Sequence, residues 1–240
     1  MTAEVKQLQI KAIFFDVFGT LVDWRTSIAR EAREILEPLG YQLDWPAFAD
    51  AWRGEYQPAM EQVRSGKIPF CKLDVLHMHN LEQILPRFKV GSIDDATKQK
   101  LNLAWHRLDA WPDVSIGLSR LKRKFMIAPV SNGNISLMVA LARRNELPWD
   151  AILGSEIAGD FKPKPRVYLS ACEAFDLESA QCMMAAAHPN DLAAAAACGL
   201  RTGYISRPNE KGRPAEYAAP EENFDVSAAS VVELAVKLGA

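Results

Sequence analysis

The sequence of 240 residues predicts an α/β fold in which a doubly wound parallel sheet is interrupted early by an all-helical insertion. Two observations predict it. From Trp111 onward, apolar runs alternate with helical patterns, which is typical of parallel strands joined by helices. Residues 24–112, in contrast, carry helix-like periodicity throughout and almost no β-branched runs. We therefore expect a core formed by residues 1–22 and 110–240, and an inserted helical cap at residues 23–109.

The first predicted strand is the apolar run from Ile10 to Phe15. A short run without polar alternation is what a strand buried on both faces requires. It stops at Asp16, and Gly19 follows in a turn. Open α/β sheets bind ligands at the carboxyl ends of their strands, so Asp16 lies where a functional site is expected.

The other elements follow from periodicity and from glycine, proline or polar breaks. Within the insertion, helices are predicted at 27–39, 46–63, 72–85 and 94–108. In the core, strands are predicted at 125–131, 151–155, 182–187 and 201–205, and helices at 113–124, 135–145, 166–175, 190–198 and 230–238. The polar segment 209–222 is rich in Gly and Pro and is interpreted as a surface loop.

The composition is that of an ordinary globular protein. Hydrophobic residues make up 49% of the chain, and 28 Lys+Arg against 30 Asp+Glu give a formal net charge of -2. No positive excess favours nucleic acid or an anionic membrane, so neither is expected as a partner. The four cysteines form no CxxC pair, and the first residues lack the apolar core of a signal peptide, so reduced thiols and a cytoplasmic location are expected.

Asp16 is the first candidate for chemistry. A carboxylate in a strand-end turn most often only caps that turn. Here Gly19 and Thr20 follow at a spacing that lets backbone N–H groups surround a small anion, and Thr20 adds a hydroxyl. The pattern favours a reactive carboxylate over a simple turn cap.

Polar residues also follow three later strands. Ser131 and Asn132 end one strand and supply donors suited to an anion, although such a sequence also marks plain turns. Lys162 precedes a proline and could aim one ammonium inward, where it would keep a nearby Asp ionised; alone it would be interpreted as a surface lysine. His188 and Asp191 follow the next strand, where Asp191 could equally cap a helix.

These four strand ends, in this order, resemble the haloacid dehalogenase-like hydrolase superfamily, and within it the type II (L-2-haloacid) dehalogenases. The resemblance covers nearly the whole chain. It implies a Rossmann-like core, an inserted helical cap and an aspartate nucleophile. The residues that match the motifs of these dehalogenases are Asp16, Gly19, Thr20, Arg53 of a Trp-Arg pair, Ser131 to Gly133, Lys162, Tyr168 and Asp191, with Phe70 where a family aromatic lines the halide pocket.

The residues directly after Asp16, Val17 and Phe18, distinguish a dehalogenase from a phosphatase. Phosphatases of this superfamily carry a second aspartate two residues after the nucleophile, because an alkoxide leaving group needs a proton. A halide leaves without one, so Val17 and Phe18, the two non-acidic residues that follow Asp16, are compatible with dehalogenation. Phosphatases also place two acidic groups at the last motif to help hold Mg²⁺, whereas only Asp191 is present here. No metal and no cofactor are expected.

The resemblance implies hydrolysis of a short 2-haloacid, from the L-2-haloacid to the D-2-hydroxy acid, through an ester on the nucleophile. Arg53 and Asn132 are expected to stabilise the halide, Ser131 the substrate carboxylate, and Asp191 the hydrolytic water. The expected catalytic residues are Asp16, Thr20, Lys162, His188 and Asp191, and the expected substrate and halide contacts are Val17, Phe18, Arg53, Phe70, Ser131, Asn132 and Tyr168.

One departure and two alternatives stay open. Type II enzymes have a Ser and an Asn shortly before the late aspartate, where this chain has Ala186 and His188. His188 could replace the amide as a partner of the water, or it could be structural. The alternatives are a phosphonatase-like hydrolase, for which Lys67 or Lys72 would form a Schiff base, and a non-catalytic member that binds an anion or a partner protein. The oligomeric state is also left open, with a homodimer as one alternative.

Overall fold

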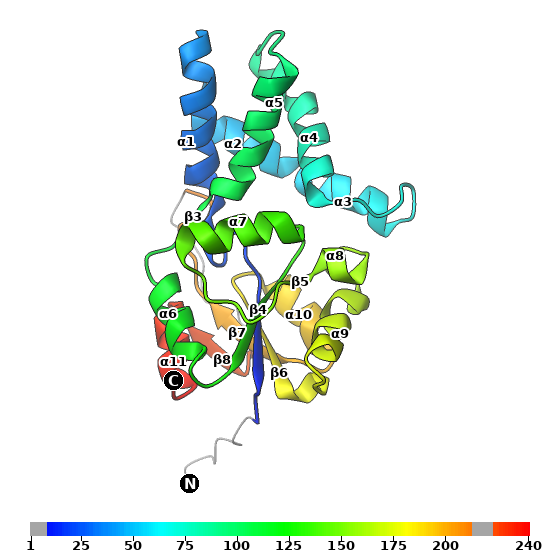
Figure 1. Ribbon diagram of the computed structural model, residues 1–240, viewed down its shortest axis with the longest axis vertical. Coiled ribbons are helices and arrows are strands. Elements are labelled where there is room, and N and C mark those ends of the chain that lie inside the picture. Colours follow the sequence, from blue (N-terminus) through cyan, green and yellow to red (C-terminus); the bar gives the residue numbers. More distant parts are fainter. Residues whose placement is uncertain (1–8, 213–222) are drawn as a thin grey trace.

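The computed structural model describes residues 9–212 and 223–240 and contains a parallel sheet beneath a layer of helices (Figure 1). The six strands of the sheet lie in the order β5-β4-β1-β6-β7-β8. Every pairing between them is parallel. Their bounds are β1 Ala12–Phe15, β4 Met126–Ser131, β5 Leu153–Gly154, β6 Cys182–Ala186, β7 Arg201–Ile205 and β8 Val226–Ala228. The sheet confirms the predicted Rossmann-like α/β class.

The central strand β1 is buried on both faces, as its unbroken apolar run predicts. Ile13 and Phe15 pack on one side with α6 (Val114–Leu121), α7 (Ile135–Asn145) and α11 (Val231–Lys237). Ala12 and Phe14 pack on the other side with α9 (Pro165–Ala174) and α10 (Pro189–Ala197). Because successive strand residues point to opposite faces, this division shows that the sheet is doubly wound.

Register brings the strand ends together. Phe15 pairs with Pro129 of β4 and with Ala185 of β6, so the residues that follow these strands leave the sheet at one edge. The backbone N–H of Asp16 donates to the carbonyl of Ala185 (3.0 Å). The polar side chains after β1, β4 and β6 therefore share the carboxyl edge of the sheet.

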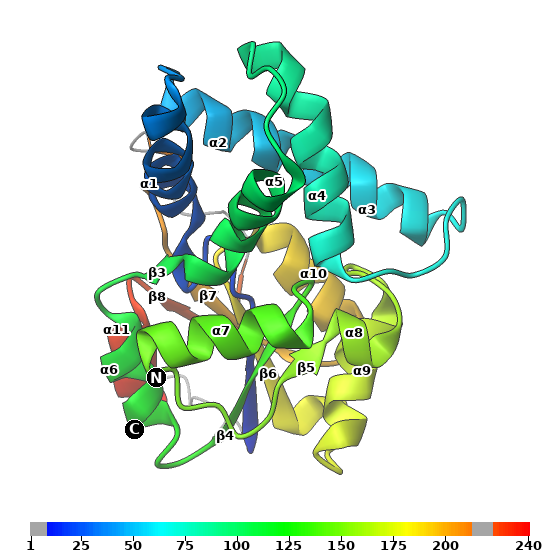
Figure 2. The same cartoon turned by 45° about the horizontal axis from the view of Figure 1, so that its top comes forward.

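A helical cap is inserted between two short strands, β2 (Val22–Asp23) and β3 (Asp109–Ala110), which pair antiparallel. Figures 1 and 2 show the cap helices grouped over the carboxyl edge of the sheet. They are α1 Trp24–Leu36, α2 Trp45–Gly54, α3 Tyr56–Arg64, α4 Leu73–Ile84 and α5 Asp95–Asn102, with 3₁₀ helices at Glu37–Leu39, Leu85–Phe88 and Leu103–Arg107.

Two predicted cap helices were wrong in extent. The single helix expected at 46–63 is two helices, because α2 ends at Gly54 and α3 begins at Tyr56. Pro58 lacks an N–H to continue the earlier helix and is tolerated only in the first turn of a new one. The helix expected at 94–108 tightens after Asn102 into a 3₁₀ helix, as helix ends often do, and enters β3 from there.

The short elements escaped prediction. The strands β2, β3 and β8, the helix α8 (Ser155–Ala158) and the 3₁₀ helix Ser179–Gln181 have two to four residues, too few to show a period. Within the described part of the chain, no helix combines the length and apolarity needed to cross a membrane.

Candidate active site

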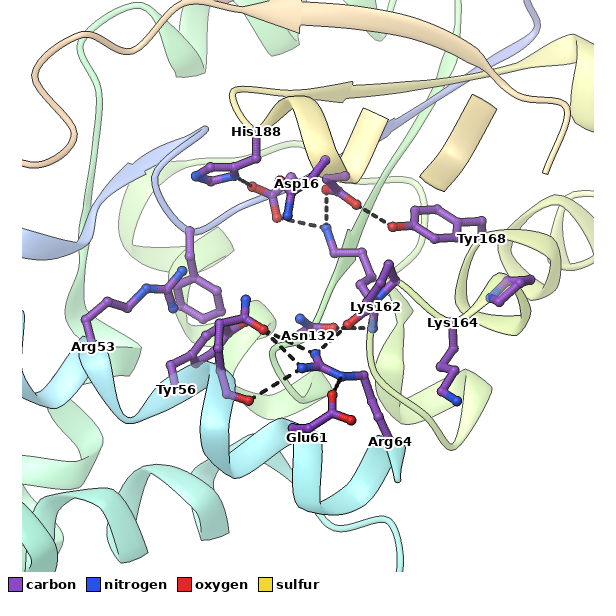
Figure 3. A pocket seen from close by; sticks show the side chains of 16 residues that line it. Asp16, Arg53, Tyr56, Glu61, Arg64, Asn132, Lys162, Lys164, Tyr168 and His188 are labelled. Carbon is purple, nitrogen blue, oxygen red and sulfur yellow. Dashed lines mark hydrogen bonds and ion pairs between the residues drawn. The ribbon is translucent and has the colours of Figure 1, made fainter. Parts of the chain in front are cut away.

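Asp16 opens onto a cavity of about 620 Å³ between the sheet edge and the cap (Figure 3). The core lines it with residues from the ends of β1, β4 and β6, and the cap lines it from α2 and α3. The lining side chains used below are Asp16, Phe18, Arg53, Tyr56, Arg64, Asn132, Lys162, Tyr168, His188 and Asp191. Most of the predicted site residues therefore meet in one place.

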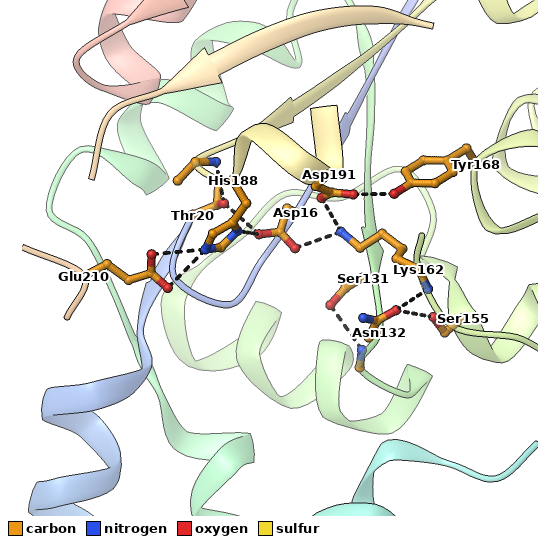
Figure 4. Close-up of polar contacts among 12 residues, drawn as sticks. Asp16, Thr20, Ser131, Asn132, Ser155, Lys162, Tyr168, His188, Asp191 and Glu210 are labelled. Carbon is orange, nitrogen blue, oxygen red and sulfur yellow. Dashed lines mark hydrogen bonds and ion pairs between the residues drawn. The ribbon is translucent and has the colours of Figure 1, made fainter. Parts of the chain in front are cut away.

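The Asp16 carboxylate is held from both sides (Figure 4). Lys162 Nζ donates to Oδ1 at 2.9 Å, and Thr20 Oγ1 donates to Oδ2 at 2.7 Å. His188 Nδ1 lies 3.1 Å from Oδ2. Burial opposes ionisation, but the Lys162 ammonium and His188 outweigh it and hold the pKa of Asp16 well below its usual range. Asp16 is therefore a carboxylate at neutral pH.

Lys162 bridges two buried carboxylates. Its Nζ also donates to Asp191 Oδ2 at 2.5 Å, and Tyr168 Oη donates to Asp191 Oδ1 at 2.5 Å. Burial alone would lower the pKa of Lys162, but Asp16 and Asp191 raise it. Burial raises the pKa of Asp191, and Lys162 opposes that effect. Both oxygens of Asp191 are engaged, so in this arrangement Asp191 anchors Lys162.

His188 connects Asp16 to a carboxylate that sequence reasoning missed. Its Nε2 lies 3.1 Å from both Glu210 oxygens, and Trp24 Nε1 donates to Glu210 Oε1 at 3.1 Å. Burial opposes protonation, but hydrogen bonds to Asp16 and Glu210 raise the pKa of His188 to about 10. Residues 209–212 form a loop as predicted, but Glu210 departs from its surface character, because its side chain is 13% exposed and points into the site. The rest of that loop, 213–222, lies outside the described residues.

The two polar residues after β4 play different parts. Asn132 Oδ1 accepts from the Lys162 backbone N–H and from Ser155 Oγ, both at 2.8 Å. These contacts fix the amide, and its N–H₂ group is left as a donor beside the cavity. Ser131 is fully buried and accepts from the backbone N–H of Gly133, so its hydroxyl shapes the turn and does not line the cavity.

Arg53 faces Asp16 from the cap inside an aromatic cage. Its guanidinium carbon lies 3.8 Å from the Tyr56 ring centre and 5.5 Å from those of Phe18 and Trp24. One guanidinium nitrogen, Nη1, is buried and has no hydrogen-bond partner among the described residues. A cation with a buried, unpaired donor atom beside a cavity is suited to an anion.

Comparison with known proteins identifies the family. The model of the haloacid dehalogenase-like hydrolase family matches residues 10–199. The chain belongs to this family. The solved structure of a defluorinating L-2-haloacid dehalogenase is 40% identical to this chain, with a TM-score of 0.93, and the match covers 96% of each chain. The solved structure of another L-2-haloacid dehalogenase is 41% identical, with a TM-score of 0.91, and that match covers 96% of this chain and 99% of the other. The (S)-2-haloacid dehalogenase 1 of Pseudomonas sp. (strain CBS-3) is 28% identical over 95% of this chain and 98% of its own.

Several residues named from the sequence lie apart from the cavity of this family member. Phe70 packs on Phe161, with ring centres 5.2 Å apart, and does not line the cavity. Val17 is buried, and its carbonyl accepts from the N–H groups of the following turn. Lys72 pairs with Glu156 at 3.1 Å across the cap–core boundary. Neither Lys72 nor Lys67 lines the cavity, so neither lies where a Schiff-base lysine would have to be.

Arg64 joins the cap to the core and was not predicted. It donates to the backbone carbonyl of Lys162 at 2.9 Å, and its other donors contact Gln57 and Glu61. Because these partners occupy its guanidinium, Arg64 holds α3 against the loop that carries Lys162. No sequence pattern predicts this contact, since an arginine at a helix end is usually a surface residue.

The donor set around Asp16 does not fit the Mg²⁺ that phosphatases use. Magnesium needs several oxygen ligands in octahedral geometry. Here the Lys162 ammonium lies between Asp16 and Asp191. The position two residues after Asp16, where a phosphatase has its second aspartate, is occupied by Phe18 and follows the equally non-acidic Val17. Among the described residues, no cluster of three His, Cys, Asp or Glu side chains is arranged to hold a metal ion.

Proposed function

We propose that this protein hydrolyses short L-2-haloacids to D-2-hydroxy acids, with inversion, through an ester on Asp16. The observation that carries the proposal is the pairing of an ionised Asp16 with the free guanidinium nitrogen of Arg53 at the same cavity. A nucleophile and an anion site are what displacement of a halide requires. Relatives named as (S)- and L-2-haloacid dehalogenases support the substrate class.

In the first step, an Asp16 oxygen attacks the halogen-bearing carbon. A carbon–oxygen bond forms as the carbon–halogen bond breaks, and the halide takes the bonding electrons. Arg53 and the N–H₂ group of Asn132 stabilise the departing anion. Lys162 keeps the nucleophile ionised, and no proton is needed because a halide is the leaving group.

In the second step, water attacks the ester carbonyl carbon of Asp16 and releases the 2-hydroxy acid. The substrate carbon is inverted only once, because this attack occurs at the carbonyl. Thr20 and Lys162 remain beside the Asp16 oxygens and stabilise the negative charge that develops there. Asp191 and Tyr168 keep Lys162 in place.

We propose that residues 23–109 act as the cap that covers this chemistry, with the β2–β3 ribbon as its junction to the core. The antiparallel pairing of Asp23 with Asp109 supports these boundaries. We also propose a cytoplasmic location, which the free thiols of all four cysteines support. Light scattering of the purified chain distinguishes a monomer from a homodimer.

Halide release from L-2-chloropropanoate tests the activity directly. We expect release by the wild-type protein with and without EDTA, and loss of release in Asp16→Asn, which keeps the size of the side chain but removes its charge. Release by Asp16→Asn equal to wild type would rule out Asp16 as nucleophile. Comparison with fluoroacetate as substrate measures the halogen preference.

A further inference from the structure

Glu210 lies on the opposite side of His188 from the nucleophile. The residue follows β7 in the sequence, and its side chain returns to the turn after β1 (Figure 4). Gly19 in that turn makes this approach possible. A Cβ at Gly19 would lie 2.1 Å from Glu210 Oε1, and the φ of +84° also disfavours a side chain there. The turn and the late segment therefore fit each other at this carboxylate.

The three side chains form a chain of contacts from Asp16 through His188 to Glu210. His188 Nδ1 lies 3.1 Å from Asp16 Oδ2, and its Nε2 lies 3.1 Å from Glu210. Trp24 holds Glu210 from the cap side. A carboxylate beside Nε2 keeps a proton on that nitrogen, so Nδ1 is the ring atom that can gain or lose one.

Solvent reaches His188 from a second side. A further cavity of about 340 Å³ borders the ring and Glu210, with Arg207 and Lys211 on its rim. The His188 side chain is 31% exposed, whereas that of Asp191 is 9% exposed and both its oxygens are occupied. A proton can therefore leave His188 for solvent, while Asp191 is more deeply buried and each of its oxygens already accepts a hydrogen bond.

We propose that His188 Nδ1 is the base of the second step and that Glu210 is the positioning residue that orients it. This inference rests on the proposed dehalogenation. It replaces the expectation that Asp191 deprotonates the water. Neither the motif match nor the comparisons assign a part to Glu210, whose segment was interpreted as a loop.

The charge on Asp16 controls when the base is available. In the resting enzyme His188 is a cation between two carboxylates, and Nδ1–H donates to Asp16. Formation of the ester removes the charge of Asp16, so the Nδ1 proton passes to solvent while Nε2–H stays on Glu210. The neutral ring then faces the ester carbonyl with a free lone pair.

Protons balance over the cycle. Water adds its oxygen to the Asp16 ester carbonyl carbon and gives one proton to Nδ1. The bond from this carbon to the product oxygen then breaks, and the remaining proton of the water goes to that oxygen. The 2-hydroxy acid, the Asp16 carboxylate and the His188 cation result. One proton and one halide are released for each haloacid and water consumed.

The test is a rapid-quench experiment with L-2-chloropropanoate on Glu210→Gln. Glutamine can still accept from Trp24 and His188 but carries no charge. We expect a chloride burst of one per site at the wild-type rate, followed by turnover slowed about tenfold to a hundredfold, the range for losing a charge-assisted hydrogen bond. Intact-protein mass spectrometry should show the Asp16 ester accumulating. His188→Gln should show the same ester with turnover slowed about a hundredfold or more.

Glu178→Gln is the matched control, since it makes the same change at the N-terminal end of β6, away from the site. It should behave as wild type. An equal loss of burst rate and turnover in Glu210→Gln and His188→Gln, without ester, would overturn the assignment of the base and leave dehalogenation standing. A wild-type protein that releases no chloride would overturn both proposals.

Discussion

The two oxygens of the Asp16 carboxylate face opposite environments. Oδ1 faces Lys162, which is buried in a hydrogen-bonded network with Asp191 and Tyr168. Oδ2 faces His188, which is partly exposed and borders a second cavity. The Lys162 and Asp191 side chains are each about nine-tenths buried and paired with one another, so this side holds charge in place. The His188 side is partly exposed and can exchange a proton with solvent. We therefore assign the charge of the nucleophile in the first step to the Lys162 side, and the proton transfer of the second step to the His188 side.

Lys162→Met should have the largest effect, because it removes the only cation in direct contact with both buried carboxylates among the described residues. We expect unfolding free energy to fall by about 3–5 kcal/mol, the cost of leaving a buried charge without its partner. The halide burst should be lost as well. Chemical denaturation and rapid quench measure the two effects. Lys122→Met, which breaks a partly exposed pair with Asp150, should cost about 1 kcal/mol or less. Similar losses in both variants would contradict the contrast in burial.

Arg53→Lys tests the part of the cap in the first step, the departure of the halide. Lysine keeps the charge but loses the planar contact with Tyr56 and the second donor nitrogen. We expect the halide burst to slow about a hundredfold, as for loss of one preorganised donor, while hydrolysis of a formed ester is unchanged. Rapid quench of chloride and of product separates the steps. An ester that accumulates in Arg53→Lys would place Arg53 in the wrong step.

The smallest expected effect is that of His188→Gln on the free energy of unfolding as a function of pH. Asp16 and Glu210 face the ring directly, and Arg53, Lys162, Arg207 and Lys211 are the cations around them. The folded-state pKa of His188, about 10, is raised above the ordinary value of 6.5. The stabilisation by His188 is therefore complete below pH 6.5 and is lost as the pH rises toward 10. Denaturation of wild type and variant should show a stability difference that shrinks over this window; a constant difference would mean that His188 is neutral in the fold.

The sequence predicted those parts of the site that follow from strand ends. Asp16, Asn132, Lys162 and Asp191 each follow or precede a recognisable element, and a parallel sheet must bring such ends to one edge. Contacts that depend on a loop folding back had no such signal. Glu210 lies 22 residues after His188 in a polar segment, and only the structure shows it over Gly19.

The direction in which a side chain points was the other feature that could not be predicted from the sequence. The sequence placed Asp191 beside the site, and its assignment to the hydrolytic water ignored Tyr168, one helix earlier, as a partner. The resemblance to the dehalogenases implied a cavity wall at Phe70, but this ring packs on Phe161. Period and motif locate a residue on an element, whereas its hydrogen-bond partners depend on how the elements pack.

A single turnover in H₂¹⁸O, with enzyme in excess over L-2-chloropropanoate, tests the central claim that Asp16 forms the ester. Water attacks the Asp16 carbonyl carbon in this account. The label should therefore appear first in the Asp16 carboxylate, in the peptide that contains it, and the hydroxy acid from the first turnover should be unlabelled. Label in the first-turnover product, with none in Asp16, would contradict the ester and the division of labour between the two sides of the carboxylate.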